Sequence, residues 1–549
     1  MTNTRTDMSI LTSQRQPFFA LLLILAASAG LYLPWIDNPL VFDDPNLLKS
    51  PALSDFAIVP FSLRYPRQFP YFTLGMEHVL SNGNLHVSRY VALVLHGLNG
   101  FLLFVLSRRL LSTITEPSKA ALLAFAVGLL FVVHPVSVYA AGYLIQRTIL
   151  FATFFLLLSA IQFDKALTEG SWYRAAFAGL CYGMAAISKE HAMPGFLAVA
   201  MLFFLRDSST RPTLHQPLRV FLAVSIPIAA WITLIKLGYV ATAYEPDVSE
   251  VISSSGIPDM GSRLGNWALS AALQCGFFFR YIGFWLWPSP AGMSIDIRPD
   301  FASLVTSPWL VIGPAALFLT TLVAFRVLTS KHTSLRWRLV AYCLTWPLVL
   351  FIVEVSAVRF QEAIVLYRSY LWAPGLMISA SVMASKLSKR STALILLILA
   401  TLFSLLNQQI LTTMSNNLLL WQDALNKAPK IQSVDIARIH YNIGQEFLHN
   451  NQITKAEAEF NWIIDNHPNI AAGYLGRSII SSHKKETKKA IQDLETVVKL
   501  DPSIGIAHLR LALLYYKDNN PTLGDHELIL AKNYGYSIPI ILDKKNAQR

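Results

Sequence analysis

The sequence predicts an all-α protein in two parts, a membrane domain of about eleven spanning helices followed by an array of short helix pairs. The first observation is composition. The 549 residues are 54% hydrophobic and only 14% charged, whereas an average soluble domain has about 25% charged residues. The second is a series of long apolar segments that runs to about residue 411. The third is a period of 34 residues beyond residue 412, where the composition becomes that of a soluble domain.

The membrane domain is expected over 17–411, after a polar tail at 1–16. Its first apolar segment, 17–33, contains a run of small residues at 26–29 that weakly resembles a signal-peptidase site, and a cleaved signal peptide is the alternative interpretation. A helix needs about 20 apolar residues to cross a hydrocarbon core of about 30 Å. Ten more segments meet this need alone or with their flanks: 88–107, 119–134, 148–163, 173–188, 192–205, 218–237, 308–329, 339–358, 364–384 and 391–411.

A further segment, 264–287, is helical in character but contains Asn266, Gln274 and Arg280. We interpret it as re-entrant or interfacial, because a full crossing there would move two later basic clusters to the outer face. Cytoplasmic loops of membrane proteins are enriched in Lys and Arg. We therefore attribute the net charge of +12 to the membrane topology, and nucleic acid is not an expected partner. The N-terminal tail is then cytoplasmic, and the C-terminal part lies outside. The outer loops are expected at 34–87, 135–147, 189–191, 238–307 and 359–363.

The C-terminal part, 412–549, carries residues of matching size at intervals of 34. Small residues where two helices cross closely and large apolar residues between them are typical of tetratricopeptide repeats. Three units are expected, at 437–470, 471–504 and 505–538, and each must stack on its neighbours to bury its apolar face. The matching sets are Gly444, Ser478 and Ala512; Ala456, Ala490 and Gly524; Phe460, Leu494 and Leu528; and Ile463, Val497 and Ala531.

Several short motifs follow one another in an order typical of one known family. They are Leu40-Val41-Phe42-Asp43-Asp44-Pro45; His86-Val87-Ser88 with Val94-Leu95-His96-Gly97-Leu98-Asn99; His134-Pro135-Val136 with Gln146-Arg147; Ser188-Lys189-Glu190; Leu286-Trp287-Pro288 with Asp296; and Tyr367-Arg368-Ser369-Tyr370-Leu371 with Pro374. In these motifs the chain resembles bacterial relatives of the TMTC proteins, transmembrane and tetratricopeptide-repeat O-mannosyltransferases of the GT-C superfamily. Two departures stand out: the array is short, and Tyr367 stands where the family more often has an acidic residue or histidine.

The resemblance implies an enzyme of the bacterial inner membrane that takes a sugar from polyprenyl phosphate on the outer face. An acceptor hydroxyl attacks the anomeric carbon and the lipid phosphate leaves, which requires a base and a stabilised phosphate. Asp43 and Asp44 are the candidate bases, with Asp43 preferred. The alternative is an Asp-Asp-Pro turn or helix cap, where aspartate is favoured. No cofactor is identified, although the two carboxylates could hold a divalent metal ion.

Cationic side chains are the natural partners of the phosphate. Arg368, Lys189 and Arg147 fall at outer ends of spans, where the topology rule disfavours positive charge. The alternatives are snorkelling side chains or an ion pair, such as Lys189 with Glu190. His134 is a fourth candidate that could instead cap a helix. Positioning of sugar or acceptor is assigned to three residues: Glu77, His78 and Glu190.

We therefore expect transfer of a sugar to a hydroxyl of a periplasmic acceptor, with a protein as the preferred acceptor and the repeats as its recognition surface. One alternative is a transferase or ligase acting on surface polysaccharide or a lipid-linked glycan. An alternative of another class is a non-catalytic membrane scaffold whose repeats bind partners. The three cysteines lie far apart in apolar stretches, so neither a disulfide framework nor a zinc site is expected.

Overall fold

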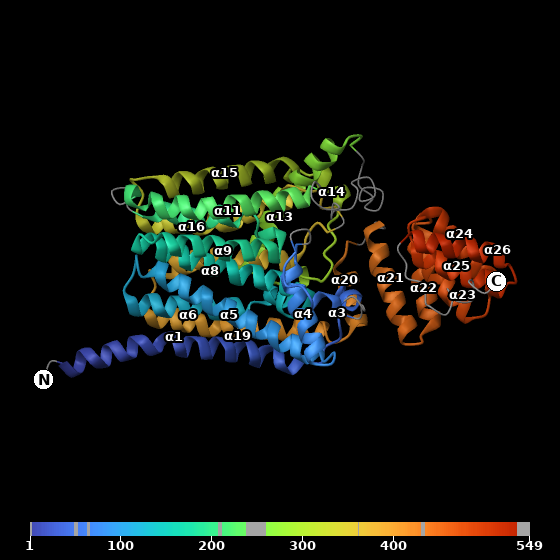
Figure 1. Cartoon of the computed structure of the whole chain (residues 1–549), viewed down its shortest axis with the longest axis horizontal. Helices are drawn as coiled ribbons and strands as arrows, with labels where there is room; N and C mark the ends of the chain where they lie inside the picture. The colour runs from blue at the N-terminus through green and yellow to red at the C-terminus, as the bar shows by residue number, and fades with distance from the viewer. Residues whose placement is uncertain are drawn as a thin grey trace. The chain divides into compact units, whose positions relative to one another are not determined.

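The computed structural model describes residues 3–48, 53–62, 66–206, 211–237, 260–360, 362–429 and 434–534. Its described residues form helices and no extended strand; one isolated bridge pairs Ile297 with Ile364. The all-α expectation is therefore confirmed. The chain divides into two compact units. The first contains the helices to α19 and the second contains α20 to α26 (Figure 1).

The first unit is a bundle of long apolar helices (Figure 1). Its longer helices are α1 (Asn3–Tyr32), α5 (Leu85–Leu111), α6 (Pro117–Val133), α8 (Arg147–Glu169), α9 (Trp172–Ser188), α11 (His215–Lys236), α13 (Arg263–Leu286), α15 (Trp309–Thr329), α16 (Leu335–Leu350), α18 (Ala373–Ala384) and α19 (Lys389–Thr413). The shorter helices include α2 (Asp44–Leu48), α3 (Leu53–Phe56), α4 (Gln68–Leu80), α7 (Val138–Ala141), α10 (Gly195–Ala200), α14 (Phe301–Val305) and α17 (Ile352–Val355). Short 3-10 turns important for the site are η2 (Pro135–Ser137), η3 (Leu144–Gln146), η4 (Glu190–Ala192) and η8 (Leu366–Leu371).

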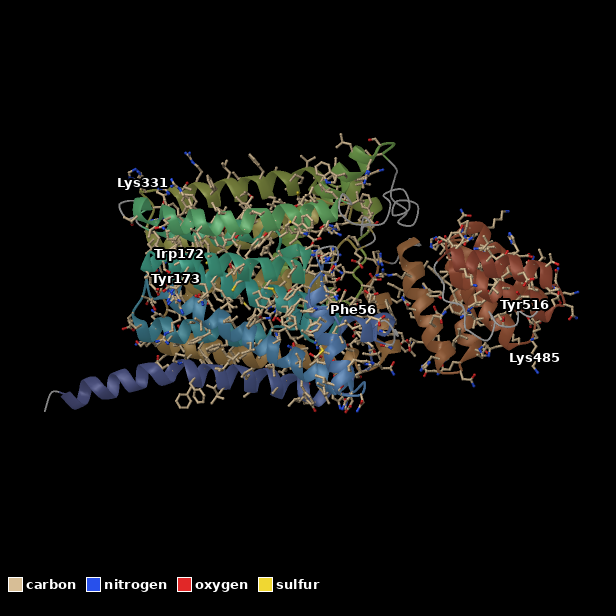
Figure 2. The ribbon with its side chains drawn as sticks, in the orientation of Figure 1. Phe56, Trp172, Tyr173, Lys331, Lys485 and Tyr516 are labelled. Atoms are coloured by element: carbon tan, nitrogen blue, oxygen red, sulfur yellow. The ribbon has the colours of Figure 1, made fainter. Side chains whose placement is uncertain are left out.

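Seven helical segments among the described residues are long and apolar enough to cross a membrane, or eight with one bent pair. The seven are Gln16–Trp35, Leu85–Leu111, Leu144–Glu169, His215–Ile235, Trp309–Thr329, Leu335–Val355 and Lys389–Thr413. Their exposed faces are apolar. In the span of α15 only 11% of residues are buried in the protein, against 72% in that of α8. A helix that exposes so much apolar surface requires a nonaqueous neighbour, so these helices suggest a membrane protein. Trp172 and Tyr173 begin α9 with exposed rings, as is common at a membrane interface (Figure 2).

The expected count of eleven spans is not confirmed. The segment 119–134 becomes half of a pair bent by 50°. The segment 173–188 forms a helix of 17 residues, and 192–205 and 364–384 give shorter apolar helices. Three of these segments break at a proline, Pro135, Pro194 or Pro374, and proline both lacks an N–H and clashes with the preceding turn. The segment 173–188 is short because its helix lies between Ser171 and Lys189, which both have extended backbone. The segment 264–287 is one continuous helix, α13, so the chain does not reverse direction within it.

The bent pair shows how this unit tolerates a broken apolar helix. The break at His134 and Pro135 leaves three carbonyls at the end of α6 without helical partners. Each accepts from a side chain: Phe131 O from Ser137 Oγ at 2.8 Å, Val132 O from His96 Nε2 at 3.1 Å, and Val133 O from Asn407 Nδ2 at 3.3 Å. An unsatisfied carbonyl is energetically costly away from water. The hydrogen bonds from His96 and Asn407 therefore fix α5 and α19 against the break.

Small residues allow the helices around this break to approach closely. A Cβ atom added at Gly128 in α6 would lie 2.5 Å from the carbonyl oxygen of Gly100 in α5. A Cβ atom at Gly375 in α18 would lie 2.2 Å from the Cys343 carbonyl oxygen in α16. Larger residues at these positions would push the helices apart, because the clashing atoms belong to the backbone.

The second unit contains α20 (Asn417–Lys427) and six helices in three pairs: α21 (Val434–His449), α22 (Ile453–Asn466), α23 (Ala471–His483), α24 (Thr487–Leu500), α25 (Gly505–Lys517) and α26 (Pro521–Asn533). Consecutive helices contact each other throughout. The residues matched at intervals of 34 are buried, and the Phe460 ring lies 2.6 Å from where a Cβ at Gly444 would be. The last four residues of the expected unit 505–538 lie outside the described residues.

The three pairs share the same turn. Asn451, Lys485 and Asn519 stand 34 residues apart and all adopt the left-handed conformation, with φ of 56°, 61° and 58°. In each turn the next residue's N–H donates across five residues to a carbonyl of the first helix at 2.8 Å. This hydrogen bond is typical of a helix end at which the residue directly after the C-cap is left-handed. The period in the sequence therefore corresponds to a repeated helical hairpin.

Candidate functional site

The two adjacent aspartates take different positions at the start of α2. The Asp44 side chain is buried, 1% exposed, and its carboxylate accepts from Ile145 N at 2.8 Å and Leu144 N at 3.3 Å. It therefore caps η3, where α8 is about to begin. Burial raises the pKa of Asp44 to about 7, although these backbone hydrogen bonds favour the ionised form. Asp44 is an anchor between the first loop and α8.

Asp43, in contrast, is exposed. The Tyr143 hydroxyl donates to its Oδ2 at 3.0 Å and accepts from the Asp43 backbone N–H at 3.0 Å. Tyr143 is itself buried, and burial together with the nearby aspartates raises the pKa of its phenol, so it remains a donor. The structure thus assigns the anchoring role to one aspartate and leaves the carboxylate of the other at the surface, oriented by a tyrosine.

Two tyrosine rings connect Asp43 to a lysine. The ring centroids of Tyr143 and Tyr367 lie 6.1 Å apart in an edge-to-face arrangement. The Lys189 ammonium lies 5.6 Å from the centroid of Tyr367, within the range of a cation–π contact. Tyr143 follows α7, Tyr367 belongs to η8, and Lys189 ends α9. Three segments that are distant in sequence therefore converge. We call Asp43, Tyr143, Tyr367 and Lys189 the aspartate–lysine cluster.

Lys189 is a buried cation that has no ionic partner among the described residues. It is 4% exposed, and its ammonium forms no hydrogen bond or salt bridge within the described ranges. Its expected partner, Glu190, instead forms a two-point ion pair with Arg67, whose Nε lies 3.0 Å from Oε2. Burial, with Arg67 and Arg368 nearby, lowers the pKa of Lys189 to about 7. A buried charge is normally paired, so this ammonium is suited to an anionic ligand.

Arg368 is engaged by carboxylates. Its NH1 lies 3.1 Å from Glu354 Oε2, and its NH2 pairs with the Glu362 carboxylate. Glu354 is fully buried in α17 and also lies 3.1 Å from His191 Nε2. The guanidinium fork that would bind a phosphate is therefore occupied. In this arrangement Arg368 holds η8, and with it Tyr367, against α17.

Arg147 is fully enclosed by the protein. Its NH1 donates to Glu77 Oε1 at 2.6 Å and to Thr73 Oγ1 at 3.1 Å, and its NH2 donates to Ser88 O at 2.8 Å. Arg147 and Glu77 therefore join α4, α5 and α8. Among the described residues, neither side chain forms a hydrogen bond or an ion pair with the aspartate–lysine cluster.

The two candidate histidines, His134 and His78, are surrounded by residues outside the aspartate–lysine cluster. His134 is buried, stacks on Trp285 at 4.3 Å between centroids, and donates from Nε2 to Trp285 O at 3.1 Å. Its Nδ1 accepts from Val136 N at 3.3 Å, so it caps η2, which was the alternative interpretation. His78 lies in the last turn of α4, half-buried beside Gly83.

A metal ion at the aspartate pair stays a prediction, and the Asp43 carboxylate is the more accessible of the two that would hold it. Because both Asp44 oxygens accept from backbone amides, only Asp43 offers an accessible carboxylate. No group of three or more His, Cys, Asp or Glu residues that could hold a metal ion occurs among the described residues.

Sequence reasoning missed three residues that shape the site: Tyr143, Arg67 and Glu354. Tyr143 lies in an expected outer loop, but a lone tyrosine gives no signal of its partner 100 residues earlier. Arg67 has φ of 69°, a conformation that its sequence does not reveal. Glu354 had a detectable signal, since an acidic residue inside an expected span is unusual and points to function or a buried ion pair.

Comparison with known proteins gives no assignment: no protein-family model matches the chain, and no curated protein matches it.

Proposed function

We propose that the chain is a membrane glycosyltransferase, related to the TMTC branch of the GT-C superfamily. It transfers a sugar from polyprenyl phosphate to a hydroxyl of a periplasmic acceptor. One observation carries the proposal: an exposed carboxylate, Asp43, is linked through two tyrosine rings to the buried Lys189 ammonium, which has no hydrogen-bond or ionic partner among the described residues. A base and an anion-binding cation are the two groups that the reaction requires.

Each group has one role. The Asp43 carboxylate accepts the proton of the acceptor hydroxyl as its oxygen attacks the anomeric carbon. The bond from that carbon to the phosphate oxygen breaks, and its electron pair goes to the departing phosphate. The phosphate then carries one more negative charge, which the Lys189 ammonium stabilises. Asp44, Arg147, Glu77 and the ion pairs of Arg368 hold the surrounding helices in place.

The second unit fits an acceptor-binding role. Three helical hairpins with the same turn and buried small residues are the features of tetratricopeptide repeats, which bind extended peptides. We propose that this unit lies in the periplasm and selects a protein acceptor. The membrane-crossing topology needed for this is the one predicted by the basic loops.

Transfer by the purified full-length protein in liposomes tests the proposal. The donors are short-chain polyprenyl phosphates carrying different radiolabelled hexoses, and the acceptor is periplasmic protein from a strain that lacks the gene. The wild type should transfer label to protein. Asp43→Asn should reduce the rate about 100-fold or more, the usual contribution of a general base. The matched control is Asp37→Asn in the same loop, whose carboxylate is 84% exposed and pairs with His86; its rate should stay within about twofold of wild type.

The outcomes separate the rival functions. Label in lipopolysaccharide or in lipid-linked glycan, with none in protein, would identify the polysaccharide-directed alternative. Absence of transfer to any acceptor, together with rescue of a deletion strain by the repeats on an unrelated membrane anchor, would establish the scaffold. Full activity of Asp43→Asn would refute the assigned base.

A further inference from the structure

The hydroxyl of Tyr367 is a polar group without a protein partner in the aspartate–lysine cluster. Tyr367 is half-buried, and its side chain forms no hydrogen bond within the part of the chain that the structure describes. The other tyrosine hydroxyl of the cluster, that of Tyr143, donates to Asp43. In the same region the hydroxyl of Tyr281 bonds to both backbone groups of Val365, at 2.6 Å and 3.3 Å.

Tyr367 is also held firmly in place. η8 is fixed on one side by the ion pairs of Arg368 with Glu354 and Glu362. It is fixed on the other by Trp285 Nε1, which donates to Ser369 Oγ at 2.9 Å. A phenol that is positioned by its neighbours, yet has no hydrogen-bond partner of its own, is preorganised for a ligand.

Lys189 is the second hydrogen-bond donor beside the Tyr367 ring. Its ammonium lies 5.6 Å from the Tyr367 centroid and also lacks an ionic partner among the described residues. A charged donor over the ring and a neutral donor on the same ring match the oxygens of a phosphate, which accepts several short hydrogen bonds. The nearby carboxylates are already used, since Glu190 pairs with Arg67 and Glu362 pairs with Arg368.

We propose that Tyr367 and Lys189 together bind the phosphate of the lipid-linked donor, and that the Tyr367 hydroxyl donates to the oxygen that gains charge as the sugar leaves. This inference rests on the proposed function. The sugar phosphate is a monoanion before transfer, and the polyprenyl phosphate released is a dianion. The phenol keeps its proton throughout, while the proton lost by the acceptor goes to Asp43. Because the hydrogen bond strengthens as the charge develops, it lowers the barrier more than it tightens substrate binding.

Variants of Tyr367 separate its hydroxyl from its ring. Tyr367→Phe keeps the ring against Lys189 and removes only the donor. It should lower kcat about 10- to 100-fold, with KM changed less than about threefold, as expected for a donor that acts in the transition state. Tyr367→Leu also removes the cation–π contact that holds Lys189, so KM for the donor should rise as well. The matched control is Tyr173→Phe, whose exposed ring begins α9 (Figure 2), and it should match wild type.

A binding measurement on the full-length protein distinguishes failure of this inference from failure of the proposed function. The probes are farnesyl phosphate, farnesol and inorganic phosphate. We expect farnesyl phosphate to bind, farnesol not to bind, and inorganic phosphate to bind weakly, with about tenfold weaker binding of farnesyl phosphate by Tyr367→Phe. An inactive wild type that still shows this pattern would remove the transferase assignment and keep the phosphate site. Equal binding of farnesyl phosphate by wild type and Tyr367→Phe, or an unchanged kcat in an active enzyme, would overturn the inference.

Discussion

The charge state of Lys189 should govern how donor use depends on pH. Burial first, and then Arg67 and Arg368, lower the pKa of Lys189 to about 7, although Glu190 and Glu362 act in the opposite direction. With that pKa about half of the free enzyme carries the ammonium at pH 7 and about one molecule in a hundred does at pH 9. Only the protonated form attracts the donor phosphate. We therefore expect kcat/KM for the donor to fall about 50-fold from pH 7 to pH 9, since this ratio reports the free enzyme.

Lys189→Arg tests this explanation, because a guanidinium stays protonated across the whole range. Its kcat/KM, measured by initial rates in liposomes at fixed ionic strength, should be nearly level between pH 7 and 9. Asp44 also has a pKa near 7, raised by burial, so Asp44→Asn serves as the control and should keep the wild-type fall. An equally steep fall in Lys189→Arg would show that another group titrates, and the role of Lys189 as the phosphate cation would be refuted.

The same pKa has a consequence for stability. Between pH 7 and 10.5 the unfolded chain binds more protons at Lys189 than the folded protein does, so stability should rise with pH in this window. Thermal unfolding in detergent should show this rise for wild type and a smaller one for Lys189→Met.

Three further predictions concern stability. Asp44→Ala leaves the buried N–H of Leu144 and the partly buried N–H of Ile145 without an acceptor and should destabilise the protein by about 2–4 kcal/mol, while Asp44→Asn, which keeps one acceptor oxygen, should cost less in the same detergent melts. Asn407→Leu leaves a carbonyl of the α6 break unsatisfied and should cost about 1–3 kcal/mol, seen as faster hydrogen exchange at the end of α6. Lys485→Asn should stabilise the α23–α24 hairpin by about 1 kcal/mol, because the left-handed positions of the other two hairpins are already Asn451 and Asn519; an unchanged exchange rate for this hairpin would contradict the reasoning.

The sequence by itself determined the helical class and the repeated hairpins, because both depend on nearby residues. Apolar segments of sufficient length become helices wherever water is scarce, since a helix satisfies its own backbone groups. The period of 34 residues identified the buried small positions and the large residue that packs on Gly444, because each hairpin buries its own apolar face. Asp43 and Lys189 were expected as site residues from the family resemblance together with their residue types and outer location, and their roles stay predictions.

Only the tertiary structure decided which charges are paired. Arg368 and Lys189 were both expected to bind the donor phosphate, yet Arg368 faces two carboxylates and Lys189 faces a tyrosine ring. Likewise, Asp43 and Asp44 are adjacent in the chain, but only Asp44 points at the amides that begin η3. The physical reason is that an ion pair or a cap depends on which distant helices lie side by side, and packing rather than local composition fixes that choice.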